Sequence, residues 1–269
     1  MIQLSDRLNR LAPSATLAMS QKSNEMKAQG IDVINMSVGE PDYMTPDFIK
    51  EAGKKAIDGN YSKYSPVPGY LDLREAISAK LKKENGLEYG PKEIIVGTGG
   101  KQGVCNTFMA LVNPGDEVII PAPYWVSYPQ MAKLAGGTPV VIRAGIDQNF
   151  KITPEQLEKA ITPKTKLLVI CSPSNPTGSV YTQEELNALA EVILKHDDIY
   201  VLSDEIYEHI NYVGFKASIA KAPGMRERTI ICNGVSKAYA MTGWRLGWVA
   251  APEVIVKGIN KLQGQYTSG

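Results

Sequence analysis

Hydrophobic residues recur at two different spacings along the chain. Leu73, Ile77 and Leu81 stand four positions apart, which predicts an amphipathic helix. Turn-forming residues bound this helix, with Pro68-Gly69 before it and Gly86 after it. Beyond Gly86 the helical spacing gives way to short apolar runs, so a different architecture begins there.

These apolar runs are rich in β-branched residues and alternate with helical stretches. Such runs indicate strands that are buried on both faces, and their alternation with helices implies a mainly parallel sheet covered by helices. Ligands of such sheets collect outside the carboxyl ends of the strands. The predicted strands are 93–96, 117–120, 138–143, 166–171, 199–203, 229–232 and 246–250, and the predicted helices start at about Lys101 or span 183–196 and 253–262.

Length and charge narrow the kinds of partner. The chain has 269 residues, with 29 Lys+Arg against 28 Asp+Glu and a formal net charge of +1, so there is no electrostatic signature of nucleic acid or membrane binding. A small-molecule partner is expected. No repeat or flexible linker interrupts the chain, and a soft boundary near Thr45-Pro46 divides an N-terminal arm, 1–45, from a main domain, 46–269.

The cysteines and the N-terminus predict a cytoplasmic location. Cys105, Cys171 and Cys232 lie far apart in apolar runs and form neither a disulfide framework nor a CxxC metal motif. Free thiols are typical of a reducing cytosol. The first residues lack the pattern of a signal peptide, and no apolar run reaches about 18 residues, so no membrane segment is expected.

Candidate chemistry begins after the first predicted strand, in the segment GTGGK that ends at Lys101. A helix that opens after Gly99 and Gly100 offers free N–H groups and a positive dipole end to a phosphate. Gln102 excludes both a Walker A loop and a complete GxGxxG dinucleotide motif. A tight strand-to-helix turn explains the glycines equally well.

Two further side chains follow the second and fourth predicted strands. Trp125 is placed to stack on an aromatic ring, and Asn175 in SPSNPTG presents an amide that can donate and accept. Each has an ordinary alternative, since a tryptophan is commonly a core residue and Asn-Pro is a common turn.

The fifth predicted strand delivers Asp204 to its end, with Tyr207 three residues later. A carboxylate there needs a cationic partner, which is a helix N-terminus, a metal ion or a protonated ring nitrogen. A metal is the poorest of these, because His196 and His209 are not spaced as a ligand set with Asp204. A helix-capping aspartate is the ordinary alternative.

Lys237 follows the sixth predicted strand, and Arg245 follows eight residues later. A lysine next to a buried strand loses hydration, which lowers its pKa and frees the amine to form a Schiff base. The guanidinium of Arg245 has the donor fork that binds phosphate, although a surface ion pair would also explain it.

Taken together, these segments resemble those of a known family. GVSK followed by RLG, with SPSNPTG, SDEIYE, PYWVSYP and SVGEPDY in the same order, resembles the class I, fold-type I pyridoxal-phosphate-dependent aminotransferases, and most closely the prokaryotic-type aspartate aminotransferases. The likeness extends over the whole chain. It implies that 46–269 is the cofactor-binding, three-layer α/β/α large domain of that fold, with a mainly parallel sheet. Residues 1–45 would hold the N-terminal arm and part of the small domain, most of which is missing.

The resemblance also implies roles at the cofactor. Lys237 would hold pyridoxal 5'-phosphate as an imine and later move the proton between the substrate α-carbon and the cofactor. Asp204 would pair with the protonated pyridine nitrogen. Tyr207 and Asn175 would bind the phenolic oxygen, Trp125 would stack on the ring, and the phosphate would contact Arg245, Gly99, Gly100 and Lys101.

Other implied contacts concern the substrate and a second subunit. Gly39, Trp125 and Asn175 would contact the substrate, and Tyr64 resembles the tyrosine that reaches the phosphate of a neighbouring subunit, so a homodimer is expected. Gly234 stands where many members carry a hydroxyl. Family members usually continue for more than a hundred residues beyond Gly269, so we expect a truncated chain that lacks the arginine for the substrate α-carboxylate and transaminates poorly alone.

The predicted reaction is amino-group transfer between an L-amino acid, with aspartate favoured, and a 2-oxo acid, with 2-oxoglutarate favoured. Three alternatives remain open at this stage. They are a lyase or synthase of the same fold, a dinucleotide-binding oxidoreductase, and a non-catalytic cofactor-binding module. The oxidoreductase would leave Lys237, Asp204 and Trp125 unexplained.

Overall fold

The structure is a computed structural model that describes residues 3–267. Residues 1–2 of the predicted N-terminal arm and residues 268–269 of the predicted main domain lie outside this range. Within residues 3–267, seven strands form one sheet in the order β1-β7-β6-β5-β4-β2-β3. The strands β2 to β6 run parallel, and β7 is antiparallel to both of its neighbours. The mainly parallel sheet is confirmed. Its strands are β1 Ile94–Thr98, β2 Glu117–Ala122, β3 Thr138–Arg143, β4 Thr165–Cys171, β5 Tyr200–Asp204, β6 Thr229–Gly234 and β7 Leu246–Ala250.

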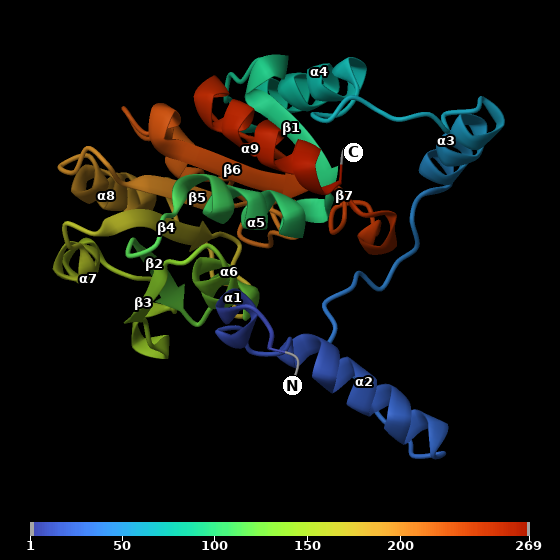
Figure 1. Cartoon of the computed structure of the whole chain (residues 1–269), viewed down its shortest axis with the longest axis horizontal. Helices are drawn as coiled ribbons and strands as arrows, with labels where there is room; N and C mark the ends of the chain where they lie inside the picture. The colour runs from blue at the N-terminus through green and yellow to red at the C-terminus, as the bar shows by residue number, and fades with distance from the viewer. Residues whose placement is uncertain (1–2, 268–269) are drawn as a thin grey trace.

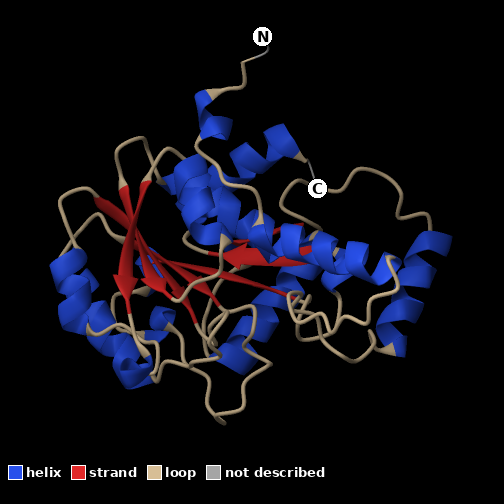
Figure 2. Cartoon of the chain, turned by 90° about the horizontal axis from the view of Figure 1, so that it is seen from below, coloured by secondary structure: helices blue, strands red, loops and turns tan. Residues whose placement is uncertain are grey.

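Helices cover both faces of the sheet and complete the three layers (Figures 1 and 2). Alternate residues of a strand pack into hydrophobic cores on opposite faces of the sheet. Leu167 and Val169 of β4 pack with α5, α6 and α9, whereas Leu168 and Ile170 pack with α7 and α8. Apolar burial on both faces is what stabilises a sheet of this type. The helices are α4 Leu71–Lys80, α5 Gly99–Leu111, α6 Ser127–Leu134, α7 Pro154–Ala160, α8 Gln183–Ile193 and α9 Glu253–Tyr266.

The predicted elements differ from the observed ones mainly at their ends. The helix around Leu73 and Ile77 is α4, and it continues through a π-helical turn, Leu81–Asn85, that ends at Gly86 with φ of +65°. The helix expected at Lys101 begins two residues earlier, at Gly99. Burial on both faces is wrong for β3, because this edge strand has one neighbour and its residues Thr138, Val141 and Arg143 are exposed.

The N-terminal helices lie outside the three layers. They are α1 Asp6–Asn9, α2 Ala15–Ala28 and α3 Asp47–Asp58, and in Figure 1 α2 projects away from the sheet while α3 lies apart, joined by extended chain. Large apolar residues on them, including Leu17, Phe48 and Ile57, are exposed. In the described part of the chain, no helix is both long and apolar enough to cross a bilayer.

Candidate active site

The sheet topology gathers the predicted residues at one edge. The parallel strands β4, β5 and β6 end there at Cys171, Asp204 and Gly234. The strand β1 also ends at this edge, where Thr98 pairs with Leu246 at the start of the antiparallel β7. The segments that follow β1, β4, β5 and β6, and the residue that precedes β7, therefore meet in one place, as the strand-end rule predicts.

A cavity of about 810 Å³ lies at this edge. Its volume is within the range of small-molecule and cofactor sites. Its wall comes from the N-terminal arm, the start of α5, and the loops after β2, β4, β5 and β6. The predicted residues that line it are Gly39, Gly100, Lys101, Trp125, Asn175, Asp204, Tyr207, Lys237 and Arg245.

Asp204 is the buried acid of this cavity, with 6% of its surface exposed. Its Oδ2 accepts a hydrogen bond from the Tyr128 hydroxyl at 2.6 Å, and its Oδ1 accepts one from the backbone N–H of Ile206 at 3.3 Å. Burial raises the pKa of Asp204, although both hydrogen bonds oppose the rise. No ion pair to Asp204 occurs among residues 3–267, so the carboxylate presents an acceptor without a cation to the cavity.

Lys237 supplies an amine whose pKa is depressed. Its Nζ is half-buried and donates to the backbone carbonyl of Gly39. Burial lowers the pKa of Lys237, the nearby Glu40 carboxylate raises it, and Arg245 lowers it, with a net decrease. The same amine lies 5.8 Å from the centre of the Tyr207 ring. A lysine in this environment gives up its proton more readily than a surface lysine does.

Tyr207 and Asn175 form a hydrogen-bonded pair on the cavity wall. The amide Nδ2 of Asn175 donates to the Tyr207 hydroxyl at 3.0 Å. Burial raises the pKa of Tyr207 to about 12. The phenol is therefore a neutral group that can still donate a hydrogen bond into the cavity.

The cationic side of the cavity combines Arg245 with the N-terminus of α5. Arg245 is held in the left-handed region at φ of +56°, and its Nη1 donates to the carbonyl of Thr242 at 2.7 Å. Gly99 and Gly247 are needed here, because a Cβ on Gly99 would meet the guanidinium and a Cβ on Gly247 would meet the backbone of Gly100. The free N–H groups and the positive end of α5 thus lie beside a guanidinium, which is an anion-binding arrangement.

Comparison with known proteins assigns the chain to one family. The family model described as "Aminotransferase class I and II" matches residues 31–268. The chain belongs to this family. A "Probable aspartate/prephenate aminotransferase" of Rhizobium leguminosarum bv. phaseoli is 54% identical over 268 residues, covering 99% of this chain and 67% of the relative. An "Aspartate/prephenate aminotransferase" of Cereibacter sphaeroides is 52% identical over 267 residues, covering 98% and 67%.

A solved structure shares the fold of this aminotransferase chain. The aspartate aminotransferase from Thermus thermophilus with maleate superposes with a TM-score of 0.97 at 45% identity, covering 100% of this chain and 70% of that one. The predicted fold class is therefore confirmed. Family membership also decides against a dinucleotide-binding oxidoreductase.

Class I aminotransferases use pyridoxal 5'-phosphate, and the cavity fits that group. The cofactor is a flat ring with a phosphate, an aldehyde and a basic ring nitrogen. The aminotransferase chain offers an anion site at Arg245 and α5, an amine at Lys237, a flat side chain at Trp125 and a buried carboxylate at Asp204. The donor set thus matches each polar feature of the cofactor.

Two predicted residues do not line the cavity. Tyr64 is 98% exposed, and Gly99 lies buried behind the Arg245 guanidinium. The role expected for Tyr64 requires a second subunit, so it remains a prediction.

Several polar side chains of the site were missed in the sequence. Tyr128 lies within the PYWVSYP segment, one helical turn after Trp125, and its hydroxyl is buried against Asp204. Thr242 donates to Glu40 Oε1 at 2.9 Å, and Tyr43 donates to the carbonyl of Lys237 at 3.1 Å. The position of Tyr128 in the motif was a usable signal. Contacts between the arm and the lysine loop, about 200 residues apart, carry no local sequence signal.

Proposed function

We propose that the chain transfers amino groups between an acidic L-amino acid, with aspartate favoured, and a 2-oxo acid such as 2-oxoglutarate. The observation that carries the proposal is that Lys237 and Asp204 line one cavity, the first with a depressed pKa and the second as a buried acceptor. The names of the bacterial relatives support aspartate as a donor and add prephenate as a candidate acceptor.

The predicted site residues have proposed parts in holding the cofactor. Asp204 accepts a hydrogen bond from the protonated ring nitrogen, and Tyr128 keeps the carboxylate aimed at it. Trp125 stacks on the ring, while Tyr207 and Asn175 bind the phenolic oxygen. The phosphate is held by Arg245, Lys101 and the backbone N–H groups of Gly99 and Gly100.

Lys237 is proposed as the group that attaches the cofactor and moves the proton of the reaction. Bound pyridoxal 5'-phosphate supplies an electron-poor ring that stabilises negative charge at the substrate α-carbon. An amine of lowered pKa is suited to accept a proton from that carbon and return it elsewhere, since general bases work best near the operating pH. The proposed substrate contacts are Gly39, Trp125 and Asn175, all on the cavity wall.

A homodimer is part of the proposal. Tyr64 and the apolar residues of α2 and α3, such as Leu17 and Phe48, are exposed, and large exposed apolar surfaces commonly mark protein interfaces. Tyr64 would then reach the phosphate of the neighbouring subunit. Free Cys105, Cys171 and Cys232 are compatible with the proposed cytoplasmic location.

Absorption spectroscopy tests the assignment of Lys237. Mixing the chain with pyridoxal 5'-phosphate should produce a visible band that borohydride fixes covalently, and a peptide map should locate the label on Lys237. The Lys237→Ala variant should lose both signals. Lys257→Ala is the matched control, because Lys257 is an exposed lysine on α9 that pairs with Glu253. An unchanged band in Lys237→Ala would refute the assignment.

The reaction itself is tested by product analysis. Adding aspartate to the loaded protein should bleach the visible band and release oxaloacetate, and adding 2-oxoglutarate or prephenate should restore it. A related lyase would instead consume aspartate over many turnovers without any 2-oxo acid, and it would release the nitrogen as ammonia or one carboxylate as carbon dioxide. Continued consumption of aspartate without a 2-oxo acid, with the band retained, would favour that alternative, and a stable band with no product from any substrate would favour a non-catalytic cofactor-binding module.

A further inference from the structure

A buried carboxylate lies just behind the cavity, on the segment that carries Tyr207. After β5 residues 205–210 form turns rather than a helix, so side-chain contacts add to the few backbone hydrogen bonds that hold this segment in place. Glu208 is 6% exposed and does not line the cavity. It pairs with the Lys80 ammonium, and its Oε2 accepts from the Asn85 amide at 2.7 Å. Glu208 is therefore anchored to the end of α4 and the π-helical turn.

Glu208 also contacts the strand that leads to Lys237. The Asn233 amide donates to Glu208 Oε1 at 2.8 Å, and Asn233 is 2% exposed. The Asn233 Oδ1 in turn accepts from the backbone N–H of Gly234 at 2.7 Å, at the point where β6 ends. A chain of hydrogen bonds thus runs from Glu208 through Asn233 to the turn that precedes Lys237. Buried and satisfied networks of this kind fix local geometry.

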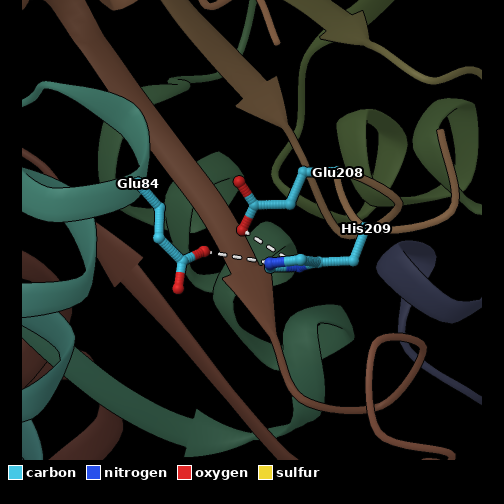
Figure 3. Close-up of side chains that lie close together, drawn as sticks. All are labelled: Glu84, Glu208 and His209. Atoms are coloured by element: carbon cyan, nitrogen blue, oxygen red, sulfur yellow. Dashed lines mark hydrogen bonds and ion pairs between the residues drawn. The ribbon is translucent and has the colours of Figure 1, made fainter. Parts of the chain in front are cut away.

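Figure 3 shows Glu208 beside His209 and Glu84, a grouping that also resembles a metal site. The ring of His209 lies 3.0 Å from Glu84 Oε2 and 3.6 Å from Glu208 Oε1. Ammonium groups already occupy these acids, however, since Lys80 pairs with Glu208 and Lys216 lies 3.6 Å from Glu84. Two lysines at the cluster would repel a divalent cation, so the cluster serves as an ion-pair network rather than a metal centre.

We propose that Glu208 is a positioning residue that sets the distance between Tyr207 and Lys237. The residue acts through two neighbours: Tyr207 is adjacent in sequence, and Asn233 transmits the constraint to the lysine turn. This inference rests on the proposed function, because only a cofactor held by both Tyr207 and Lys237 makes their separation important. The amine of Lys237 lies 5.8 Å from the Tyr207 ring, so a small shift of either segment changes that geometry.

Two variants separate positioning from simple stabilisation by the Lys80 ion pair. Glu208→Gln removes the charge and places an amide NH2 group beside Lys80, Asn85 and Asn233, which all donate to the carboxylate in wild type. Asn233→Ala leaves the Lys80–Glu208 pair intact and removes the link to β6. Glu84→Gln is the matched control, because it alters an acid of the same cluster that has no contact with Asn233 among residues 3–267.

The first readout needs no cofactor. In the unloaded protein, hydrogen exchange at the Gly234 amide should be about tenfold faster in Glu208→Gln and Asn233→Ala than in wild type. The first change weakens the charge-assisted bond between Asn233 and Glu208, and the second removes the acceptor of the Gly234 N–H, so local opening becomes easier. Glu84→Gln should match wild type. Equal exchange in all variants would overturn the proposal, as would an equal acceleration in Glu84→Gln.

The second readout is the visible circular dichroism of the protein loaded with pyridoxal 5'-phosphate, which reports how the ring is oriented. The band should fall to about half or less in Glu208→Gln and Asn233→Ala, with kcat reduced more than KM is changed, since positioning is lost in the transition state. Retention of the wild-type band and kcat in Asn233→Ala would refute the positioning role. If Glu208→Gln does not fold, Asn233→Ala decides alone.

Two further outcomes have distinct meanings. If wild type gives no visible band, the cofactor assignment fails, while the exchange at Gly234 still decides whether Glu208 holds the lysine turn. A titration with zinc alone should show no saturable site. Stoichiometric zinc binding that is lost in both Glu84→Gln and Glu208→Gln would refute the interpretation of this cluster as an ion-pair network and would indicate a metal centre.

Discussion

Replacing Tyr128 with phenylalanine tests the electrostatics of the site without disturbing its shape. The change removes the hydroxyl that donates to Asp204 Oδ2 at 2.6 Å and leaves the ring in place against Trp125. Both Tyr128 and Asp204 are buried, so the hydrogen bond between them is largely shielded from solvent. Asp204 then keeps the backbone N–H of Ile206, which donates to the other carboxylate oxygen at 3.3 Å.

The expected size follows from the charge on the acceptor. A hydrogen bond to an ionised group contributes roughly 1.5–3 kcal/mol. Because this hydrogen bond lowers the pKa of Asp204, its loss in Tyr128→Phe should raise that pKa further. Burial already places the folded-state pKa of Asp204 above its ordinary value of 3.8.

The sign of the pH dependence is then determined. A carboxyl group whose pKa is raised by folding binds more protons in the folded state, so its contribution to stability is present below pH 3.8 and is lost as the pH rises through the folded-state pKa. Tyr128→Phe raises that pKa further. The cost of Tyr128→Phe in unfolding free energy should therefore be smallest at acid pH, where Asp204 is protonated, and should increase to roughly 1.5–3 kcal/mol once Asp204 is ionised.

Urea unfolding of the unloaded protein between pH 4.5 and pH 8.5 measures this cost. Tyr124→Phe is the control, because Tyr124 lines the same cavity and its hydroxyl has no hydrogen bond to any residue in the range 3–267. Subtracting the unfolding free energy of one variant from that of the other cancels the pH dependence that comes from unrelated titrating groups. A cost for Tyr128→Phe that stays constant across this pH range would refute the coupling between its hydroxyl and the charge on Asp204.

Three further predictions follow from the same region. Gly247→Ala should destabilise the protein by about 1–3 kcal/mol in chemical denaturation, because the new Cβ would overlap the backbone of Gly100. Gly258→Ala is the control: Gly258 lies on α9 with open space around it, so this change should be neutral or stabilising. Burial raises the pKa of Glu205 from 4.5 to about 7, so the wild-type protein should lose stability as the pH rises through this range. Glu205→Gln should abolish this pH-dependent loss. Arg245→Lys should weaken binding of pyridoxal 5'-phosphate about tenfold in a fluorescence titration, because lysine lacks the planar donor fork, and an unchanged Kd would contradict the phosphate role.

The sequence predicts most of this fold because each strand leaves a strong local signal. Buried parallel strands such as β4 and β5 are continuous apolar runs, and a polar residue that follows such a run lies at the strand end wherever it occurs in the chain. Asp204 and Asn175 were identified in this way, and the structure places both on the cavity wall. The edge strand β3 was located correctly and its burial was not, since edge position depends on strand order rather than on composition.

Contacts between distant segments could not be predicted in the same way. The Tyr128–Asp204 bond joins residues 76 apart, and the bond from Asn233 to Glu208 needs β5 and β6 to be neighbours. Hydrophobic patterning does not distinguish Glu208, the last residue of SDEIYE, from an exposed acid, because its burial is set by contacts with the π-helical turn after α4. Pattern analysis detects the residues that face the ligand more readily than those that support them.

The reversed strand β7 explains why a mainly parallel sheet is not a fully parallel one here. Arg245 comes directly before β7, and Leu246 pairs with Thr98 at the edge where β5 and β6 end. If β7 ran parallel, its first residue would lie at the opposite edge, about 16 Å away across five residues of strand, and the guanidinium could not reach the start of α5. The antiparallel direction brings Arg245 beside Gly99, and the glycines at 99 and 247 make room for it. The strand direction and those two glycines are therefore requirements of one anion site.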